Sequence, residues 1–165
     1  MGTRALVPAR IETAWIVVDA SIVREILGAQ SWLSIPGARA EMPGVVAWRG
    51  RALPLVDLAA PFGLPRLAAG GARARTLICS VAENTVAVPV DAAREVHAFD
   101  VGALRPCQIT TLPYASAELD LFGRIMSVID LSRFVGEILA GGAPELAHQR
   151  SSTLSAALHS DEGSS

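Results

Sequence analysis

The side chains that most often carry chemistry are scattered along this chain. Its two cysteines, Cys79 and Cys107, lie 28 positions apart, a separation that matches no zinc-binding spacing. The three histidines, His97, His148 and His159, do not cluster either, and the last two fall in a polar, Ser-rich stretch. We therefore expect no metal site. The apolar surroundings of Cys79 predict a buried thiol that acts as a small hydrophobic side chain.

Catalytic signatures are missing as well. The chain has no Gly-x-Ser-x-Gly elbow, no Walker loop and no Gly-x-Gly-x-x-Gly after a strand pattern. Asp57 and Asp130 are better explained as helix caps than as a catalytic carboxylate pair. Gly70-Gly71 with its neighbouring arginines is compatible with an anion contact, but a flexible linker explains it more simply. The sequence predicts a protein that is not an enzyme and binds no cofactor.

One cation stands out from its surroundings: Arg49, within the apolar segment 42–58. The β-favouring residues on both sides of it predict two short strands about a tight turn, with Gly50 at positive φ. Asp57 then suits the start of a short helix and Gly63 its end. An arginine held at such a turn is poorly placed for catalysis and well placed to grip a partner. A solvated turn residue with no function is the alternative.

Composition limits the classes of protein to consider. The chain has 165 residues, of which 51% are hydrophobic and 18% charged, as in a well-buried globular protein of one domain or two small barrels. A net charge of −2, a pI near 5.9 and an aromatic content of 5% argue against nucleic-acid binding. No apolar run approaches the ~20 residues that span a bilayer, and no signal peptide is evident. We expect a cytoplasmic protein without membrane insertion.

The elements expected from the residue pattern are mainly short strands. Alternation and β-propensity predict strands over 6–11, 15–18, both arms of the Arg49 hairpin, 76–81, 85–90, 94–99 and 123–129. Pro89 indicates that 85–90 is an edge strand. Asp130 is expected to cap a helix that runs through Leu139. The segment 66–75 is the best linker candidate, and 141–165 is predicted to be a flexible polar tail.

The chain also resembles itself. Residues 50–58 (GRALPLVDL) match 123–131 (GRIMSVIDL), and residues 18–26 (VDASIVREI) match 90–96 (VDAAREV) with two residues deleted. The two matches keep the same order, at offsets of 73 and about 71 positions. An internal duplication of a unit of roughly 70 residues explains both. Short strands at regular spacing, with a helical piece closing each half, predict an all-β fold of two small barrels.

Several of these segments together resemble the CheW family of chemotaxis adaptors. They are VREIL at 23–27, IPGA at 35–38, PGVVAWRG at 43–50, LPLVDL at 53–58, VPVDAAREV at 88–96 and the closing GRIMSVIDLSRFV. The resemblance covers about 14–140. It departs from the family at Ala47, where Asn is usual, and at Arg39, where a second Pro is usual.

The resemblance implies two five-stranded SH3-like barrels with short helices and a C-terminal helix. We expect a single CheW-like domain over 1–140, with repeats at approximately 14–65 and 76–140 that each form a barrel. The implied function is an adaptor that couples the cytoplasmic tip of a chemoreceptor to a CheA-type histidine autokinase. A CheW-like module in a non-motility pathway and a small-molecule-binding double barrel remain the alternatives, with a nucleic-acid module third.

Positions shared with the family indicate where a partner would bind. The expected partner-binding residues are Val23, Glu25, Gly44, Trp48, Arg49 and Gly50. The roles of Val23 and Glu25 rest wholly on the resemblance, whereas turns need Gly44 and Gly50 in any case. The chain's tryptophans are interpreted as core or groove lining, and an exposed Trp48 would make a strong interface anchor. No local motif marks the kinase-facing surface.

Overall fold

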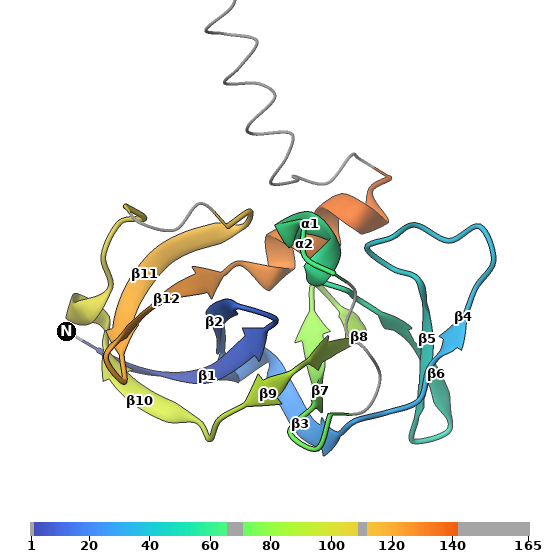
Figure 1. Ribbon diagram of the computed structural model, residues 1–165, viewed down its shortest axis with the longest axis horizontal. Coiled ribbons are helices and arrows are strands. Elements are labelled where there is room, and N and C mark those ends of the chain that lie inside the picture. The colour runs from blue at the N-terminus through green and yellow to red at the C-terminus, as the bar shows by residue number, and fades with distance from the viewer. Residues whose placement is uncertain (1, 66–70, 109–111, 142–165) are drawn as a thin grey trace, which may run out of the picture.

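The computed structural model of the chain describes residues 2–65, 71–108 and 112–141, and in these it contains two curved β-sheets side by side with two short helices at their junction (Figure 1). The prediction of an all-β fold that closes with a C-terminal helix is confirmed. We call the two sheets the terminal sheet and the central sheet, after the parts of the chain that form them.

The terminal sheet contains strands from both ends of the chain. They are β1 (Thr3–Ile11), β2 (Ala14–Asp19), β9 (Ala92–Ala93), β10 (His97–Asp100), β11 (Ala115–Leu121) and β12 (Arg124–Ile129). Their order is β10-β1-β2-β12-β11, with the two-residue β9 also beside β1. An isolated bridge between Arg105 and Glu118 ties the chain after β10 back to β11, which brings the two edges together.

The central sheet is formed by one continuous stretch of chain. Its strands are β3 (Val23–Gly28), β4 (Leu33–Ser34), β5 (Gly44–Trp48), β6 (Arg51–Leu55), β7 (Arg75–Val81) and β8 (Asn84–Val90). Their order is β3-β7-β8-β6-β5-β4. Each sheet thus has five longer strands and one strand of two residues.

The strands are shared between the sheets differently from the expected barrels over 14–65 and 76–140. The hairpin β7–β8 belongs to the second repeat but joins β3–β6 of the first. The hairpin of β1, which precedes the expected first repeat, and β2, which begins it, joins β9–β12 of the second. The two repeats have therefore exchanged their first hairpins. Sequence matching identifies which positions of the two repeats are equivalent. It cannot show which sheet each hairpin joins, because equivalent hairpins have the same edges available for pairing.

Equivalent strand pairs show the duplication directly. In the terminal sheet β12 lies parallel to β2, with Val128 opposite Val17, and in the central sheet β6 lies parallel to β8, with Leu55 opposite Ala87. The matching segments 18–26 and 90–96 are the two places where the chain crosses from one sheet to the other. Each crossover makes one sheet's hairpin continuous with the other sheet, so each sheet combines strands of both repeats.

The largest hydrophobic cluster lies between the sheets. It takes alternate side chains of both exchanged hairpins, such as Val7 and Ile16 from one and Leu77 and Cys79 from the other. The residues between them face smaller clusters inside each sheet, Val17 in the terminal sheet and Ile78 in the central sheet. Both faces of these strands are buried, which explains why they are apolar at nearly every position.

The helices close this shared core. Helix α1 (Ala59–Phe62) ends at Gly63, whose φ of +70° lets its N–H reach the carbonyl oxygens of Ala59 and Ala60. Helix α2 (Leu131–Leu139) is capped by Asp130, which accepts a hydrogen bond from the Arg133 N–H. Its buried face joins the shared cluster through Leu131, Phe134, Val135 and Ile138. Two 3₁₀ turns, Ala20–Ile22 and Val101–Ala103, complete the set.

Some expectations fall differently or outside the described residues. The strand β8 is interior rather than an edge, because β6 pairs with it at Ala87. Strand β6 leaves the ladder just beyond Ala87. Pro89, which has no N–H, is therefore not required to donate a hydrogen bond to β6. Of the expected linker at 66–75, residues 66–70 lie outside the described residues, as does all but the first residue of the tail at 141–165.

The exchange of hairpins predicts how fragments of the chain behave. A fragment of residues 1–65 lacks β7–β8, and one of residues 71–165 lacks β1–β6, so neither completes a sheet. We expect each alone to show no cooperative unfolding by circular dichroism, and an equimolar mixture to regain the strand spectrum and one transition. Independent folding of either fragment would contradict the exchanged arrangement.

The two thiols should differ sharply in reactivity. Burial raises the pKa of the Cys79 thiol to about 12, whereas Cys107 is exposed. The thiolate is the reactive form, so at pH 8 almost none of Cys79 is available. We expect an aromatic disulfide reagent to modify one thiol per chain in the native protein and two after unfolding. A Cys107→Ser variant should show no rapid native reaction, and rapid reaction there would mean that Cys79 is accessible.

Candidate functional site

The hairpin β5–β6 ends in the turn that the sequence predicts. Trp48 pairs with Arg51, which leaves Arg49 and Gly50 as a two-residue loop. Both have positive φ, +47° at Arg49 and +74° at Gly50, the geometry that fits the right-handed twist of a tight hairpin. Gly50 was expected in this conformation, but an arginine there is unusual, since side chains with a Cβ disfavour it.

A carboxylate from another strand fastens this turn. The Nε1–H of Trp48 donates to Oε2 of Glu25 over 2.9 Å, and Nη2 of Arg49 reaches the same oxygen at 3.3 Å. Glu25 lies on β3, which is separated from β5 by three strands in the sheet order. These contacts therefore cross the curved central sheet and hold its edge strand β3 close to the β5–β6 turn.

The three side chains form what we call the Arg49 cluster: Glu25, Trp48 and Arg49. The guanidinium carbon of Arg49 lies 4.8 Å from the centroid of the Trp48 ring, within range of a cation–π contact. The Arg49 side chain is 70% exposed and that of Glu25 is 33% exposed. An ion pair so open to water adds little to stability, so its main effect is to orient Arg49.

Trp48 anchors the cluster to the protein interior. It is half-buried and packs against the hydrophobic cluster of the central sheet, which includes Val46, Leu53 and Ile78. Its ring therefore has one face supported by the core while its N–H and π-system hold polar groups at the surface. The sequence predicts Trp48 as core or groove lining. In the structure this side chain is partly buried against the core and partly at the surface.

The other expected site residues lie apart from this cluster. Val23 begins β3, but a register irregularity between it and Glu25 turns it toward the core between the sheets. Gly44 stands at the opposite end of β5 from the turn and is buried. A Cβ built at Gly44 would lie 2.5 Å from Cε3 of Trp32, with the Leu33 carbonyl closer still. The glycine thus serves close packing of the chain beside β4.

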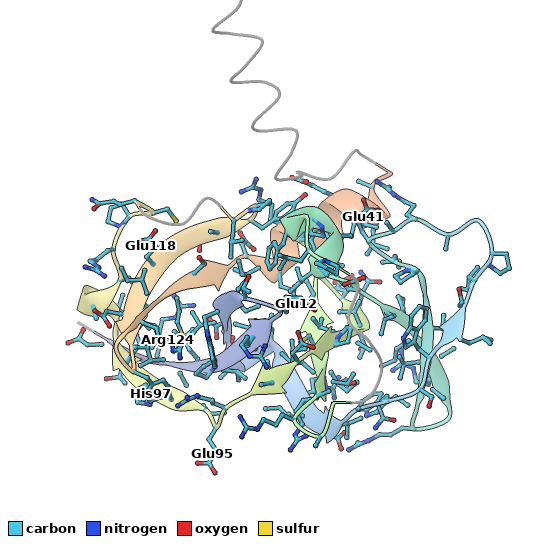
Figure 2. All side chains as sticks on the ribbon, viewed as in Figure 1. Glu12, Glu41, Glu95, His97, Glu118 and Arg124 are labelled. Atoms are coloured by element: carbon cyan, nitrogen blue, oxygen red, sulfur yellow. The ribbon has the colours of Figure 1, made fainter. Side chains whose placement is uncertain are left out.

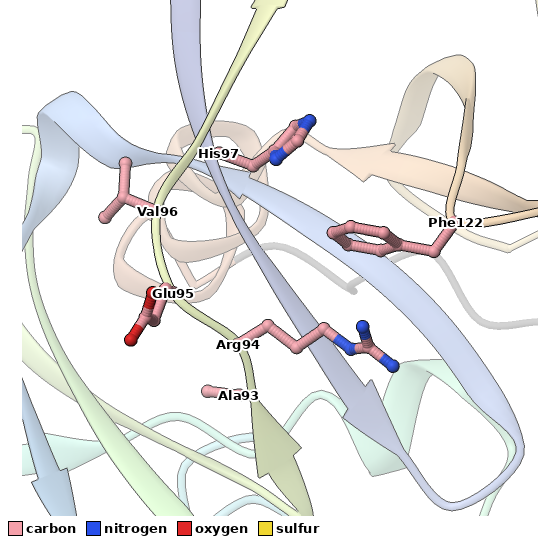
Figure 3. A pocket seen from close by; sticks show the side chains of 6 residues that line it. All are labelled: Ala93, Arg94, Glu95, Val96, His97 and Phe122. Carbon is pink, nitrogen blue, oxygen red and sulfur yellow. The ribbon is translucent and has the colours of Figure 1, made fainter.

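The duplication places a second turn of the same kind in the terminal sheet. Phe122 and Gly123 join β11 to β12 with φ of +54° and +73°, at the positions equivalent to Arg49 and Gly50. Phe122 is 49% exposed and lies at 4.6 Å from the guanidinium carbon of Arg94 and 5.2 Å from the His97 ring (Figure 3). These side chains line an open hollow of about 540 Å³.

This second turn was missed from the sequence. The signal was available, because aligning Gly50-Arg51 with Gly123-Arg124 also aligns Arg49 with Phe122. The other match, of 18–26 with 90–96, sets Glu25 against Glu95, which carries no hydrogen bond or ion pair to this turn in the described structure (Figure 2). The two equivalent turns therefore share their backbone and differ in their chemistry.

Several carboxylates away from the two turns accept hydrogen bonds from backbone N–H groups. Asp91 accepts a 2.6 Å hydrogen bond from the Glu12 N–H, and the buried Glu118 accepts one of 2.9 Å from the Gln108 N–H. Partial burial would raise the pKa of Asp19, but hydrogen bonds from Ser21 and Arg4 hold it below its usual value. Among residues 2–65, 71–108 and 112–141, no three His, Cys, Asp or Glu side chains gather as a metal ion would need.

None of the helices in the described part of the chain is long and apolar enough to cross a membrane.

Comparisons with known proteins agree on one family. A model of the CheW-like domain matches residues 6–139 of the chain. A protein of Rhizobium etli named "Probable chemotaxis protein CheW" is 32% identical over 130 residues, which are 78% of this chain and 80% of that protein. The chemotaxis protein CheW of Rhizobium meliloti is 27% identical over 134 residues, covering 79% of this chain and 86% of that protein.

A solved structure shares the fold. The crystal structure of the scaffolding protein TtCheW from Thermoanaerobacter tengcongensis matches with a TM-score of 0.71 and 21% identity. The match covers 79% of this chain and 86% of that one.

Gly44 allows a direct test of the packing beside the hairpin. We expect Gly44→Ala to lower the free energy of unfolding by about 1–3 kcal/mol in urea titrations, because its methyl group would overlap the Leu33 carbonyl and the Trp32 ring. Gly136→Ala is the matched control: it lies in α2 with open space around it and should raise stability by about 0.5–1 kcal/mol. Equal effects would show that the close approach at Gly44 is not structural.

Proposed function

The chain belongs to the CheW-like domain family, as its motifs predicted, and on that premise we propose that it is a non-catalytic adaptor. In this proposal it couples the cytoplasmic tip of a chemoreceptor to a CheA-type histidine autokinase. Family membership supports the role, and so do the names of the relatives, which are chemotaxis proteins, and of the structural neighbour, which is a scaffolding protein. The Arg49 cluster supports a particular place for the receptor contact.

The exposure of Arg49 is the observation that carries this placement. A charged side chain that is 70% exposed, yet tied at one end to Glu25 and stacked on Trp48, presents its remaining guanidinium donors outward in a fixed direction. Such a planar set of donors suits a carboxylate or the free backbone carbonyls at a helix end, both of which a helical receptor tip offers. A solvated turn arginine with no function would need none of this support.

The proposed partner-binding residues divide by role. They remain Val23, Glu25, Gly44, Trp48, Arg49 and Gly50. Arg49 and Gly50 form the contact itself, with Gly50 allowing close approach of a partner to the backbone. Glu25 and Trp48 orient Arg49, Glu25 through its carboxylate and Trp48 through its ring. Val23 and Gly44 act indirectly in this proposal, by fixing where β3 and β5 begin.

Replacement of Arg49 tests the receptor contact. We expect Arg49→Ala to weaken binding of a receptor-tip fragment by about 1–3 kcal/mol in isothermal titration, the size of an interface hot spot. Arg49→Lys should recover part of the loss, because an ammonium keeps the charge but lacks the planar donor set. Melting curves of both variants should stay close to that of the parent protein, since the ion pair at Arg49 is exposed.

Arg51 supplies the matched control. It is exposed on the same hairpin, directly after the turn, and its side chain makes no hydrogen bond or ion pair in the described structure. Arg51→Ala removes the same charge and should leave receptor affinity nearly unchanged. An unaltered affinity in Arg49→Ala would refute the placement of the receptor contact, and equal losses in the two variants would indicate a non-specific charge effect. A collapsed melting curve for Arg49→Ala would make Arg49 a structural brace of the hairpin.

A further inference from the structure

Two donors from the β5 turn converge on one oxygen of Glu25. The Trp48 indole N–H donates to Oε2 at 2.9 Å, which is a short, charge-assisted hydrogen bond, while Nη2 of Arg49 reaches the same atom at 3.3 Å. The tighter of the two contacts to Glu25 is therefore made by the neutral residue. Arg49 joins a carboxylate that Trp48 already holds in place.

Trp48 also acts on Arg49 directly. The guanidinium carbon stands 4.8 Å from the ring centroid, so the indole face attracts the cation while its N–H restrains the anion. The ring is itself packed on the hydrophobic cluster inside the central sheet. One side chain thus couples the two charged groups to the rigid part of the fold.

We propose that Trp48 is a positioning residue that holds Glu25 and Arg49 as one unit, and that it does not itself contact the receptor. This inference rests on the proposed function, because it concerns the same site. A long arginine side chain at an exposed turn samples many rotamers, and binding would have to freeze them. Restraint from two directions before the partner arrives lowers that cost. Trp48 therefore strengthens binding only through Arg49.

The second turn shows the same backbone without this arrangement. Phe122 replaces the arginine, and the guanidinium near it comes from Arg94, stacked on the ring from a different segment (Figure 3). Trp15, in the terminal sheet, lies near two guanidinium groups, those of Arg94 and Arg124, at 5.6 and 4.9 Å. Within the described residues, its indole N–H donates no hydrogen bond to a carboxylate. The tie between indole N–H, carboxylate and turn arginine is thus a property of the central sheet's turn.

A double-mutant cycle separates positioning from contact. Trp48→Phe keeps a smaller aromatic face and removes the N–H, so it should weaken receptor-tip binding about 3- to 10-fold in isothermal titration. In the Arg49→Ala background the same change should have an effect below about 1.5-fold, because nothing remains to be positioned. Trp15→Phe is the matched control and should leave affinity unchanged in both backgrounds. An equal loss in both backgrounds would overturn the proposal, since it would mean that Trp48 contacts the receptor itself.

A second measurement needs no partner. In the free protein labelled with ¹⁵N, the Trp48 indole N–H resonance should shift clearly on Glu25→Ala and stay in place on Glu95→Ala, its equivalent in the second repeat. A resonance that ignores Glu25→Ala would overturn the tie between the two residues, whatever the receptor does.

The outcomes also separate this inference from the function on which it rests. If Arg49→Ala binds the receptor tip as the parent does, the placement of the contact is lost and the inference falls with it, even where the indole resonance moves. If Arg49→Ala binds weakly while Trp48→Phe binds as the parent does, the receptor contact stands and the positioning role of Trp48 alone is refuted.

Discussion

Burial of two hairpins on both faces is the constraint on which the rest of the structure depends. The strands β1–β2 and β7–β8 place alternate side chains in the core between the sheets and the others inside their own sheets. Each hairpin pairs within one sheet and continues along the chain into the other, so separating the sheets would expose the core that both hairpins share. A large, continuous core in a chain of 165 residues follows from this exchange.

The turn of the β5–β6 hairpin lies away from this buried centre, at the protein surface. The hairpin β5–β6 needs only its apolar face and positive φ at the two turn positions, so the side chain at the first of these is free to vary. In the central sheet it is Arg49, oriented by Glu25 from β3, which three strands separate from β5 in the sheet order. Curvature of the sheet thus converts two residues far apart in the ladder into neighbours.

Local patterns in the sequence were enough for most elements and insufficient for their assembly. The turn at Arg49-Gly50, the end of α1 at Gly63 and the cap at Asp130 follow from residue type, because each satisfies a local backbone need. The exchange of hairpins and the interior position of β8 depend on which of two equivalent edges is occupied, and no local preference decides that. The Trp48–Glu25 hydrogen bond joins residues 23 positions apart through sheet closure, so neither residue type nor spacing reveals it.

The duplication also explains how one fold can present two different surfaces. Both copies keep the glycine that completes the turn, since backbone geometry leaves no choice there. The preceding residue projects outward and does not hold the fold together, so it has become a cation in one copy and a half-exposed aromatic in the other. A cation supported by a carboxylate seeks hydrogen-bond acceptors, whereas an exposed phenyl ring beside a stacked arginine favours apolar or aromatic contact. Two equivalent turns, one in each sheet, therefore offer surfaces of different chemistry.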